Sequence, residues 1–376
     1  MRSSHDDSIL DLVEITSMPT LTESADQARK AIKYGSIGMV VVSILWYLGI
    51  AAVNYYKQLY PPAPPPPTVD FGPLPAVTFP ENTNRPTLTL ELPTGQIPSF
   101  PDRMRVYRAP TRRSGFADPE KAIETAAALG FIFKPDQPTE TNYVWVLQDQ
   151  LSSRLNMDII SGHFILDRRW QNNPALAAMA NFSSYQAVTN ETEGYLRKAG
   201  LLPNDVIGAE KATPLKDDAG KLINALSLSD ADFIQIDLFR KDIEEVDPEN
   251  EKEVVASYPF YRTDPGKGLI RVVVSGGRTT AEKYIYIDYG YTAIQYENSG
   301  TYPVKTGEEA WTELSSGGGL VTVSSPKGGE IKIRKIFLGY YDAEGGQNYS
   351  MPIYIFLGDQ GLVAYVSAVR EEWIKK

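Results

Sequence analysis

An uncharged run at residues 35–53 constrains this chain most, because it is long enough to cross a membrane. It is GSIGMVVVSILWYLGIAAV, and the nearest charged residues are Lys33 and Lys57. At about 1.5 Å per residue, such a helix measures roughly 30 Å, the thickness of a bilayer's hydrocarbon core. Aromatic residues border its C-terminal side, as is typical of a membrane interface: Trp46, Tyr47, Tyr55 and Tyr56. We predict a transmembrane helix at 34–56.

Two alternatives to a membrane anchor could also give such an apolar run. A buried helix of a soluble protein could be equally apolar, but the aromatic border favours the membrane. A cleaved signal peptide is the other alternative. The long polar segment at 1–33 and the length of the apolar run favour a retained anchor instead.

Basic residues predict the orientation of this helix. Arg29, Lys30 and Lys33 precede it, whereas Lys57 alone follows it closely. Positive charge near a membrane helix favours the cytoplasmic side, and acidic residues count little in this rule. We therefore expect a cytoplasmic tail at 1–33 and the C-terminal bulk outside the cytoplasm, in a single-pass protein of the cell membrane.

Prolines dominate the next segment, which we interpret as an extended linker at 57–101. Residues 60–67 are YPPAPPPP, which excludes helix and favours a stiff polyproline II spacer. A proline-rich recognition ligand is the alternative, but the position beside an anchor favours the spacer. A short strand at 87–92 is expected at a domain edge, where proline's missing donor is tolerated.

The remainder predicts an α+β fold in two parts, 102–240 and 241–376. Asp118-Pro119-Glu120 is a helix-start signal, and Gly130 ends that helix. Further helices are expected at 184–198 and 217–226, and strands at 143–147, 154–160, 163–166 and 233–239. A helix followed by antiparallel strands thus occurs at least twice, which suggests a repeated unit.

The C-terminal part is rich in strands. They are expected at 269–274, 283–291, 292–296, 331–341, 352–357 and 362–369, with one short helix at 305–314. This pattern predicts an antiparallel sheet with packed helices. Six tyrosines between Tyr284 and Tyr302 suit strands, and core packing explains them better than a binding face does.

Charge and composition exclude several classes of function. The formal net charge of −10 argues against a nucleic-acid partner, which needs clustered basic residues. The basic set Arg103, Arg105, Arg108, Arg112 and Arg113 is interpreted as a loop-like linker or an anchor to anionic surfaces rather than a specific site. The absence of cysteine excludes disulfides, thiolate metal sites and cysteine nucleophiles.

Residues for catalysis are scarce. The two histidines are His5, on the other side of the predicted membrane, and His163, in a strand-like run where a packed histidine is favoured over a catalytic triad. The nucleophile-elbow, P-loop and zinc-protease motifs are absent from the sequence. A pair of carboxylates acting as in glycosidases stays open. We assign no catalytic, cofactor-binding or metal residue.

Two other features resemble ligand sites but have simpler explanations. The acidic run from Asp242 to Glu253 contains no glycine for a calcium-loop turn, so we interpret it as an exposed loop. Glycine clusters at 276–277, 317–319, 328–329 and 345–346 could cradle phosphate. We expect each to join strands in a hairpin.

The C-terminal strands resemble PepSY-like domains. The resemblance is carried by residues 336–342, 349–356 and 362–369, preceded by Ala310-Trp311 and the glycines at 317–319. The chain is similar in outline to the membrane-anchored YycH/YycI-type regulators of Gram-positive bacteria, although the proline spacer departs from that family. The resemblance implies a cytoplasmic tail, one membrane helix and extracytoplasmic helix-plus-sheet units that contact a sensor kinase.

We expect a non-enzymatic binding or regulatory module at the cell envelope. The expected partners are the lipid bilayer, through the 34–56 helix, and a protein at the envelope, but no nucleic acid. Alternatives are a structural subunit of a membrane assembly and a carboxylate-dependent hydrolase acting on wall polymer.

Overall fold

The computed structural model describes residues 21–59, 66–81, 85–109, 118–208, 210–247, 250, 252–323, 329–344 and 346–375. The chain divides into two units, Met1–Pro66 and Pro67–Lys376, and each is described by itself. Most of the predicted proline-rich rod, residues 60–65, lies outside the described residues, so the spacer stays a prediction. The rest of the linker predicted at 57–101 is shorter than expected, because α1 continues to Leu59 and the residues from Pro67 onward belong to the second unit, where Leu74 is buried.

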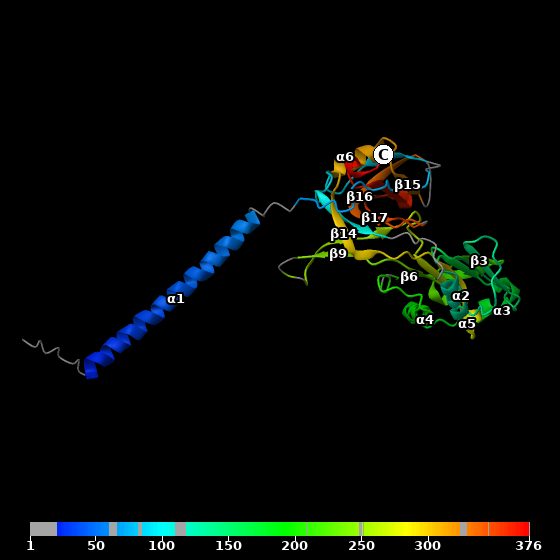
Figure 1. Cartoon of the computed structure of the whole chain (residues 1–376), viewed down its shortest axis with the longest axis horizontal. Helices are drawn as coiled ribbons and strands as arrows, with labels where there is room; N and C mark the ends of the chain where they lie inside the picture. Colours follow the sequence, from blue (N-terminus) through cyan, green and yellow to red (C-terminus); the bar gives the residue numbers. More distant parts are fainter. Residues whose placement is uncertain are drawn as a thin grey trace, which may run out of the picture. The chain divides into compact units, whose positions relative to one another are not determined.

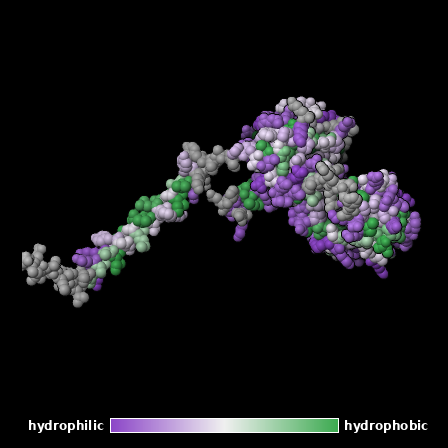
Figure 2. Space-filling view, in the orientation of Figure 1, coloured by the Kyte–Doolittle hydropathy of each residue, from purple (hydrophilic) through white to green (hydrophobic). Residues whose placement is uncertain are grey.

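The first unit contains one long helix, α1 (Leu21–Leu59), drawn in blue in Figure 1. Its segment Ala25–Tyr56 has a mean hydropathy of 2.2 in its most apolar window, and no part of that window is buried. Large side chains stand in the open along the helix, such as Met39 at 73% and Trp46 at 72% exposure. Figure 2 shows the hydrophobic residues in green along its middle. α1 is therefore long and apolar enough to span a membrane.

The second unit contains an eight-stranded antiparallel sheet, in the order β3-β4-β5-β13-β12-β8-β6-β7. The bounds are β3 (Asn142–Leu147), β4 (Ser153–Asp158), β5 (Phe164–Asp167), β6 (Glu210–Asp218), β7 (Lys221–Asn224), β8 (Phe233–Leu238), β12 (Ile270–Ser275) and β13 (Tyr284–Tyr289). β3 to β5 form a meander, and β13 and β12 lie between this meander and the strands β8, β6 and β7.

One face of this sheet is covered by two helices, α2 (Asp118–Ala128) and α4 (Tyr185–Lys198). Ala122 and Ala126 of α2 pack with Leu196 of α4 on alternate strand residues such as Ile236. Side chains alternate between faces along a strand, so one set of residues builds this core. The Ser184 side chain caps α4 by accepting a hydrogen bond from the backbone N–H of Ala187.

The opposite face is covered in part. Trp170, in the short 3₁₀ helix η1 (Trp170–Asn172), and Leu176, in α3 (Ala175–Ala178), pack on Phe233, Val273 and Ile285. The one-turn helix α5 (Thr280–Lys283) precedes β13 and starts with a capping box between Thr279 and Glu282. Short 3₁₀ helices complete the connections: η2 (Leu228–Asp230), η3 (Asp359–Gly361) and η4 (Glu371–Trp373).

A second sheet, of six strands, is built mainly from the end of the chain. Its main order is β1-β16-β18-β19-β15, and β11 also pairs with β16. The bounds are β1 (Thr87–Leu90), β11 (Phe260–Tyr261), β15 (Leu320–Val323), β16 (Glu330–Tyr341), β18 (Pro352–Gly358) and β19 (Leu362–Ser367). Helix α6 (Gly307–Ser315) packs against it through Ala310 and Leu314. The predicted edge position of the 87–92 strand is confirmed, because β1 ends the main order.

Two smaller sheets complete the unit. β14 (Gln295–Pro303), β2 (Arg103–Arg108) and β17 (Tyr349–Ser350) form a three-stranded sheet, and β9 (Ile243–Val246) pairs with β10 (Val254–Tyr258) as a ribbon. The core around β2 brings together Leu74, Val106, Tyr302 and Val369. The described chain is therefore α+β, as predicted, with one apolar helix near its N-terminus.

Three local predictions are wrong. The helix expected at 217–226 is a hairpin of β6 and β7, because Ala219 and Gly220 both adopt positive φ, 51° and 87°, as a tight hairpin turn requires. The stretch from Arg103 is a strand, β2, whose Met104 and Val106 are buried; Arg112 and Arg113 lie outside the described residues. The loop predicted for the acidic run is wrong over Ile243–Val246, which form β9 of the β9–β10 ribbon, whereas Asp247, Asn250 and Glu253 lie in the connection that leads to β10.

The glycine clusters and the domain boundary also differ from expectation. Gly276 and Gly277 lead to α5, and the glycines at 317–319 join α6 to β15, so neither cluster forms a simple hairpin. Of the other two clusters, Gly328 and the residue at 345 lie outside the described residues. Strand pairing crosses the predicted boundary between 240 and 241, because β12 and β13 belong to the sheet of β3 to β8.

Candidate functional site

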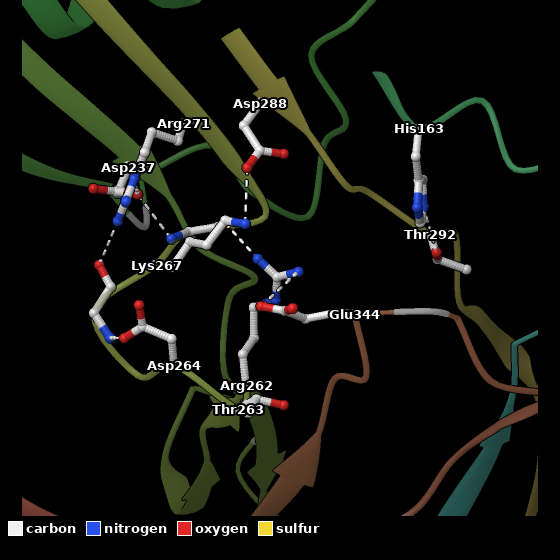
Figure 3. Close-up of polar contacts among 12 residues, drawn as sticks. His163, Asp237, Arg262, Thr263, Asp264, Lys267, Arg271, Asp288, Thr292 and Glu344 are labelled. Atoms are coloured by element: carbon white, nitrogen blue, oxygen red, sulfur yellow. Dashed lines mark hydrogen bonds and ion pairs between the residues drawn. The ribbon is translucent and has the colours of Figure 1, made fainter. Parts of the chain in front are cut away.

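His163 directly precedes β5, at the end of the turn from β4. Its Nε2 lies 3.2 Å from the Thr292 hydroxyl, and burial lowers the pKa of its imidazole. Figure 3 shows the pair apart from the charged residues of the same region. A catalytic histidine needs a carboxylate to orient it and a nucleophile to activate, whereas this ring contacts the Thr292 hydroxyl and the backbone of Tyr291. The packing role predicted for His163 agrees with this contact.

A pocket of about 780 Å³ surrounds His163. Apolar residues of the helix-covered core form part of its wall, including Met157, Ile159 and Leu201, and Tyr291 lies beside His163. Burial, followed by the charge of Asp205, raises the pKa of the Tyr291 hydroxyl to about 12. At neutral pH this tyrosine is therefore uncharged and can donate a hydrogen bond.

The face of the eight-stranded sheet opposite α2 and α4, which Trp170 and Leu176 cover in part, carries polar residues in register. We call this surface the polar face. The pairing places its residues in two rows across six strands: Arg154, Asp167, Tyr286, Val273, Gln235 and Thr213 in one, and Asn156, Ile165, Asp288, Arg271, Asp237 and Lys211 in the other. Charges of opposite sign are cross-strand neighbours in both rows, which stabilises an antiparallel sheet.

Asp237 organises one side of the polar face. It is 1% exposed, and its Oδ1 accepts hydrogen bonds of 2.8 Å from the backbone N–H of Gly268 and from Nε of Arg271. Its Oδ2 accepts a third, 2.7 Å, from the side-chain amide of Gln235. A buried carboxylate with three donors is fully satisfied, so Asp237 fixes the loop 262–268 against the sheet.

The loop 262–268 approaches the sheet closely at Gly268. A Cβ atom at this position would lie 2.7 Å from the carbonyl oxygen and 2.8 Å from the nitrogen of Leu238. The loop is tied further by Arg271, which donates 3.0 Å to the carbonyl of Gly266, and by Arg262, which donates 2.6 Å to that of Gly268. Only glycine fits here without a shift of the backbone.

Lys267 projects from this loop over the polar face. Its Nζ lies 2.8 Å from Oδ2 of Asp288, as Figure 3 shows beside the Arg271–Asp237 pair. A pocket of about 360 Å³ lies here, lined by Lys267, Arg271, Asp288, Tyr286 and Trp170 among others. Burial and the nearby charge of Asp288 raise the pKa of the Tyr286 hydroxyl. The site can therefore offer hydrogen-bond donors and acceptors beside an aromatic ring.

Exposed apolar residues lie among these charges. Ile165, in the second row, is 44% exposed, and Val146, opposite Arg154 on β3, is 39% exposed. The polar face therefore presents charged, apolar and aromatic side chains together. The described residues contain no cluster of three or more histidine, aspartate or glutamate side chains that could hold a metal ion.

Arg240 follows β8 and is buried at the junction of the two large sheets. It contacts the carboxylates of Asp205 and Asp342, the latter 3.0 Å from its Nε, and donates 2.7 Å to the carbonyl of Thr292. Phe260 and Tyr291 lie over its guanidinium, with ring centroids at 5.3 and 5.0 Å. Burial alone would lower the pKa of Arg240, but the two carboxylates raise it above its ordinary value. Arg240 therefore stays charged and links segments far apart in sequence.

The tyrosines at 284–302 divide between packing and surface. Tyr284 and Tyr302 are buried, which confirms the packing prediction for them. Tyr286 instead lies on the polar face, in the row with Asp167 and Val273. The polar alternation along β8, β12 and β13 is visible in the sequence. Its assembly into rows depends on the strand order, which the sequence of one strand does not contain.

Comparisons with known proteins give no family for this chain. No family model matches it, and no curated protein matches it. Among solved structures, it is similar to an uncharacterized protein from Eubacterium rectale, with 10% identity, a TM-score of 0.37, and coverage of 70% of this chain and 82% of the other. It is also similar to the YpeB C-terminal domain of Bacillus megaterium, with 10% identity, a TM-score of 0.26, and coverage of 69% and 94%.

TM-scores this low carry no argument about what the chain does. The PepSY-like fold of the sequence analysis therefore stays a prediction, and so do its repeated units.

Proposed function

We propose that this chain is a single-pass membrane protein whose second unit is a non-catalytic binding or regulatory module outside the cytoplasm, at the cell envelope. The length and hydropathy of α1 support the anchor. The basic residues Arg29, Lys30 and Lys33 support a cytoplasmic N-terminus. PepSY-like units, a polyproline spacer and a regulatory role are the finer parts of this proposal.

The polar face is the observation that carries the binding role. Its charges neutralise one another in pairs, such as Lys267 with Asp288 and Arg271 with Asp237, while Asp167 makes no ion pair with another described residue. Such a surface keeps a low net charge but a strong pattern of potential. Pattern rather than net charge is what selects one protein partner over another. We propose that an envelope protein docks on this face.

The non-catalytic part rests on His163. A hydrolase of the Ser-His-Asp type would need this ring to contact an acid, whereas its hydrogen-bond partners are the hydroxyl of Thr292 and the backbone of Tyr291. Two carboxylates of the polar face are engaged as structural acceptors: Asp288 pairs with Lys267, and Asp237 accepts from three donors. These residues favour recognition over bond cleavage.

The absence of cysteine gives a direct test of topology. Single cysteines are introduced at Ser4, in the predicted cytoplasmic tail, and at Asn298, in β14 of the second unit. Intact cells are treated with a membrane-impermeant maleimide, and lysed cells serve as the reference. We expect labelling of Asn298→Cys in intact cells and of Ser4→Cys after lysis alone. The reverse pattern would reject the orientation. Recovery of neither labelled variant in the membrane fraction would reject the anchor.

Site-specific photo-crosslinking tests the polar face in the full-length protein. A photoreactive amino acid replaces Ile165, on that face, and Ile132, which is 86% exposed between α2 and β3, serves as the matched control. We expect a discrete protein adduct from position 165 and none of that mass from position 132. Equal adducts from both positions, or none from Ile165 across growth conditions, would contradict the proposal.

A further inference from the structure

A separate pocket of about 520 Å³ lies where β8 ends and β11 leads into the loop 262–268. Charged residues of both signs line it, including Glu210, Arg240, Arg262 and Lys267. Its volume is in the range of small-molecule sites, about 300–1,000 Å³. Apolar side chains, Leu357 and Val363, form another part of the wall. The pocket can thus accommodate a small polar molecule with an aliphatic part.

Two buried atoms on the lining residues have no hydrogen-bond partner among the described residues. They are Nε of Arg262 and Oε2 of Glu210. Arg262 is 6% exposed; its Nη1 donates 2.6 Å to the carbonyl of Gly268, and its Nη2 lies 3.9 Å from a Glu344 oxygen. Buried polar atoms are nearly always paired with protein, water or ligand, so these two require an explanation.

The other charged groups of the pocket are already engaged. Arg240 contacts two carboxylates, and Lys267 lies 2.8 Å from Asp288. Asp242 accepts a hydrogen bond of 2.8 Å from the hydroxyl of Ser257, and Asp264 accepts one of 2.9 Å from the backbone of Gly266. Two groups are therefore left without a partner among the described residues: the Nε donor of the cationic Arg262 and the Oε2 acceptor of the anionic Glu210.

We propose that this pocket binds a zwitterion, either a free amino acid or a short peptide. Its carboxylate accepts a hydrogen bond from Nε of Arg262, and its ammonium group donates to Oε2 of Glu210. Charge-assisted hydrogen bonds of this kind are shorter and stronger than neutral ones. An aliphatic side chain packs against Leu357 and Val363. The proposal is independent of protein docking on the polar face.

The test is isothermal titration calorimetry on the full-length protein in lipid nanodiscs. The probes are leucine and the dipeptide Gly-Leu, each also as its N-acetyl and its C-terminal amide derivative. We expect saturable binding of one zwitterion with one-to-one stoichiometry, and at least tenfold weaker binding of each blocked derivative. Preference for leucine or for the dipeptide distinguishes an amino acid site from a peptide site. No saturable binding of either would mean that water satisfies the two groups, which overturns the proposal.

Variants assign the two ends of the ligand. Glu210→Gln preserves the shape of the side chain and should weaken zwitterion binding at least tenfold while removing the discrimination against the N-acetyl derivative. Arg262→Lys should also weaken zwitterion binding at least tenfold, and it should remove the discrimination against the C-terminal amide, because lysine lacks the Nε donor of the guanidinium. Glu124→Gln, exposed on α2, is the matched control and should leave the affinity unchanged. Unchanged discrimination in Glu210→Gln would overturn the assignment, and the blocked probes test the wild-type protein without any variant.

Discussion

Nε of Arg240 lies 3.0 Å from Oδ2 of Asp342, although the two residues are 102 positions apart in the chain. Asp342 follows β16 of the six-stranded sheet, and Arg240 follows β8 of the eight-stranded sheet. Asp205 contacts the same guanidinium. One buried cation thus holds two carboxylates from different parts of the second unit.

Replacing this cation should destabilise the unit strongly. Arg240→Met leaves Asp205 and Asp342 without their buried partner, and we expect a loss of about 3–5 kcal/mol in the free energy of unfolding. Arg334→Met is the control, because Arg334 also contacts two carboxylates but on the exposed surface, where ion pairs contribute little. Urea unfolding measures both. A similar loss in the two variants would contradict a special role for the buried cluster.

The close approach of Gly268 to β8 gives a second prediction. Gly268→Ala places a methyl group 2.7 Å from the carbonyl oxygen of Leu238 and should cost about 1–3 kcal/mol. The same substitution at Gly194, in the middle of α4 with open space around it, should instead stabilise by about 0.5–1 kcal/mol. Thermal unfolding compares the two. Equal shifts in melting temperature would show that the loop 262–268 moves freely.

His163 predicts the pH dependence of stability. Burial lowers its pKa in the folded state, so the unfolded chain binds a proton more readily, at its ordinary pKa of about 6.5. Stability is therefore full above that pKa and falls as the pH decreases through about 6.5. His163→Asn should flatten the dependence of melting temperature between pH 7 and 5.5. His5→Asn, in the N-terminal tail, should preserve it; the same slope in both variants would exclude the imidazole as its source.

The apolar surface of α1 gives a fourth prediction. Val41→Arg with Leu45→Arg places two charges at the middle of the uncharged run, where each costs about 2.5–3.5 kcal/mol on insertion scales. We expect the double variant to be extracted from membranes by alkaline carbonate, whereas the wild type is retained. Ile32→Arg with Ser36→Arg, at the N-terminal end of the run, keeps the same spacing and should be retained. Retention of both would argue against a membrane-spanning α1.

Most of the helices and strands can be predicted from capping residues and hydrophobic periodicity, because these signals depend on residues that are close in the sequence. The start of α2 at Asp118, the cap of α4 at Ser184 and the alternation in β8 are all visible without tertiary information. The hairpin at Ala219 was missed because alanine rarely adopts positive φ, and the surrounding residues suit a helix equally well. β2 was missed because its exposed arginines outweighed the period-two signal of Met104 and Val106.

The candidate sites required long-range pairing that one sequence does not supply. Asp237 and Arg271 are 34 residues apart, and their contact depends on the register between β8 and β12. Glu210 and Arg262 are brought to one pocket by the meeting of separate segments. None of these residues could be assigned to a site from the sequence alone, because the strand order determines which side chains become neighbours.

The first described segment of the second unit is bound to its last. Leu74 forms a parallel bridge with Ile374. The N–H of Leu74 donates a hydrogen bond of 2.7 Å to the carbonyl of Trp373, and the N–H of Lys375 donates one of 2.7 Å to the carbonyl of Leu74. In mechanical terms, a pull on the chain from the side of α1 would first load the bonds of Thr68 and Val69 to Thr301 of β14, and then this clasp at Leu74. These short contacts, rather than either large sheet, would bear the tension first.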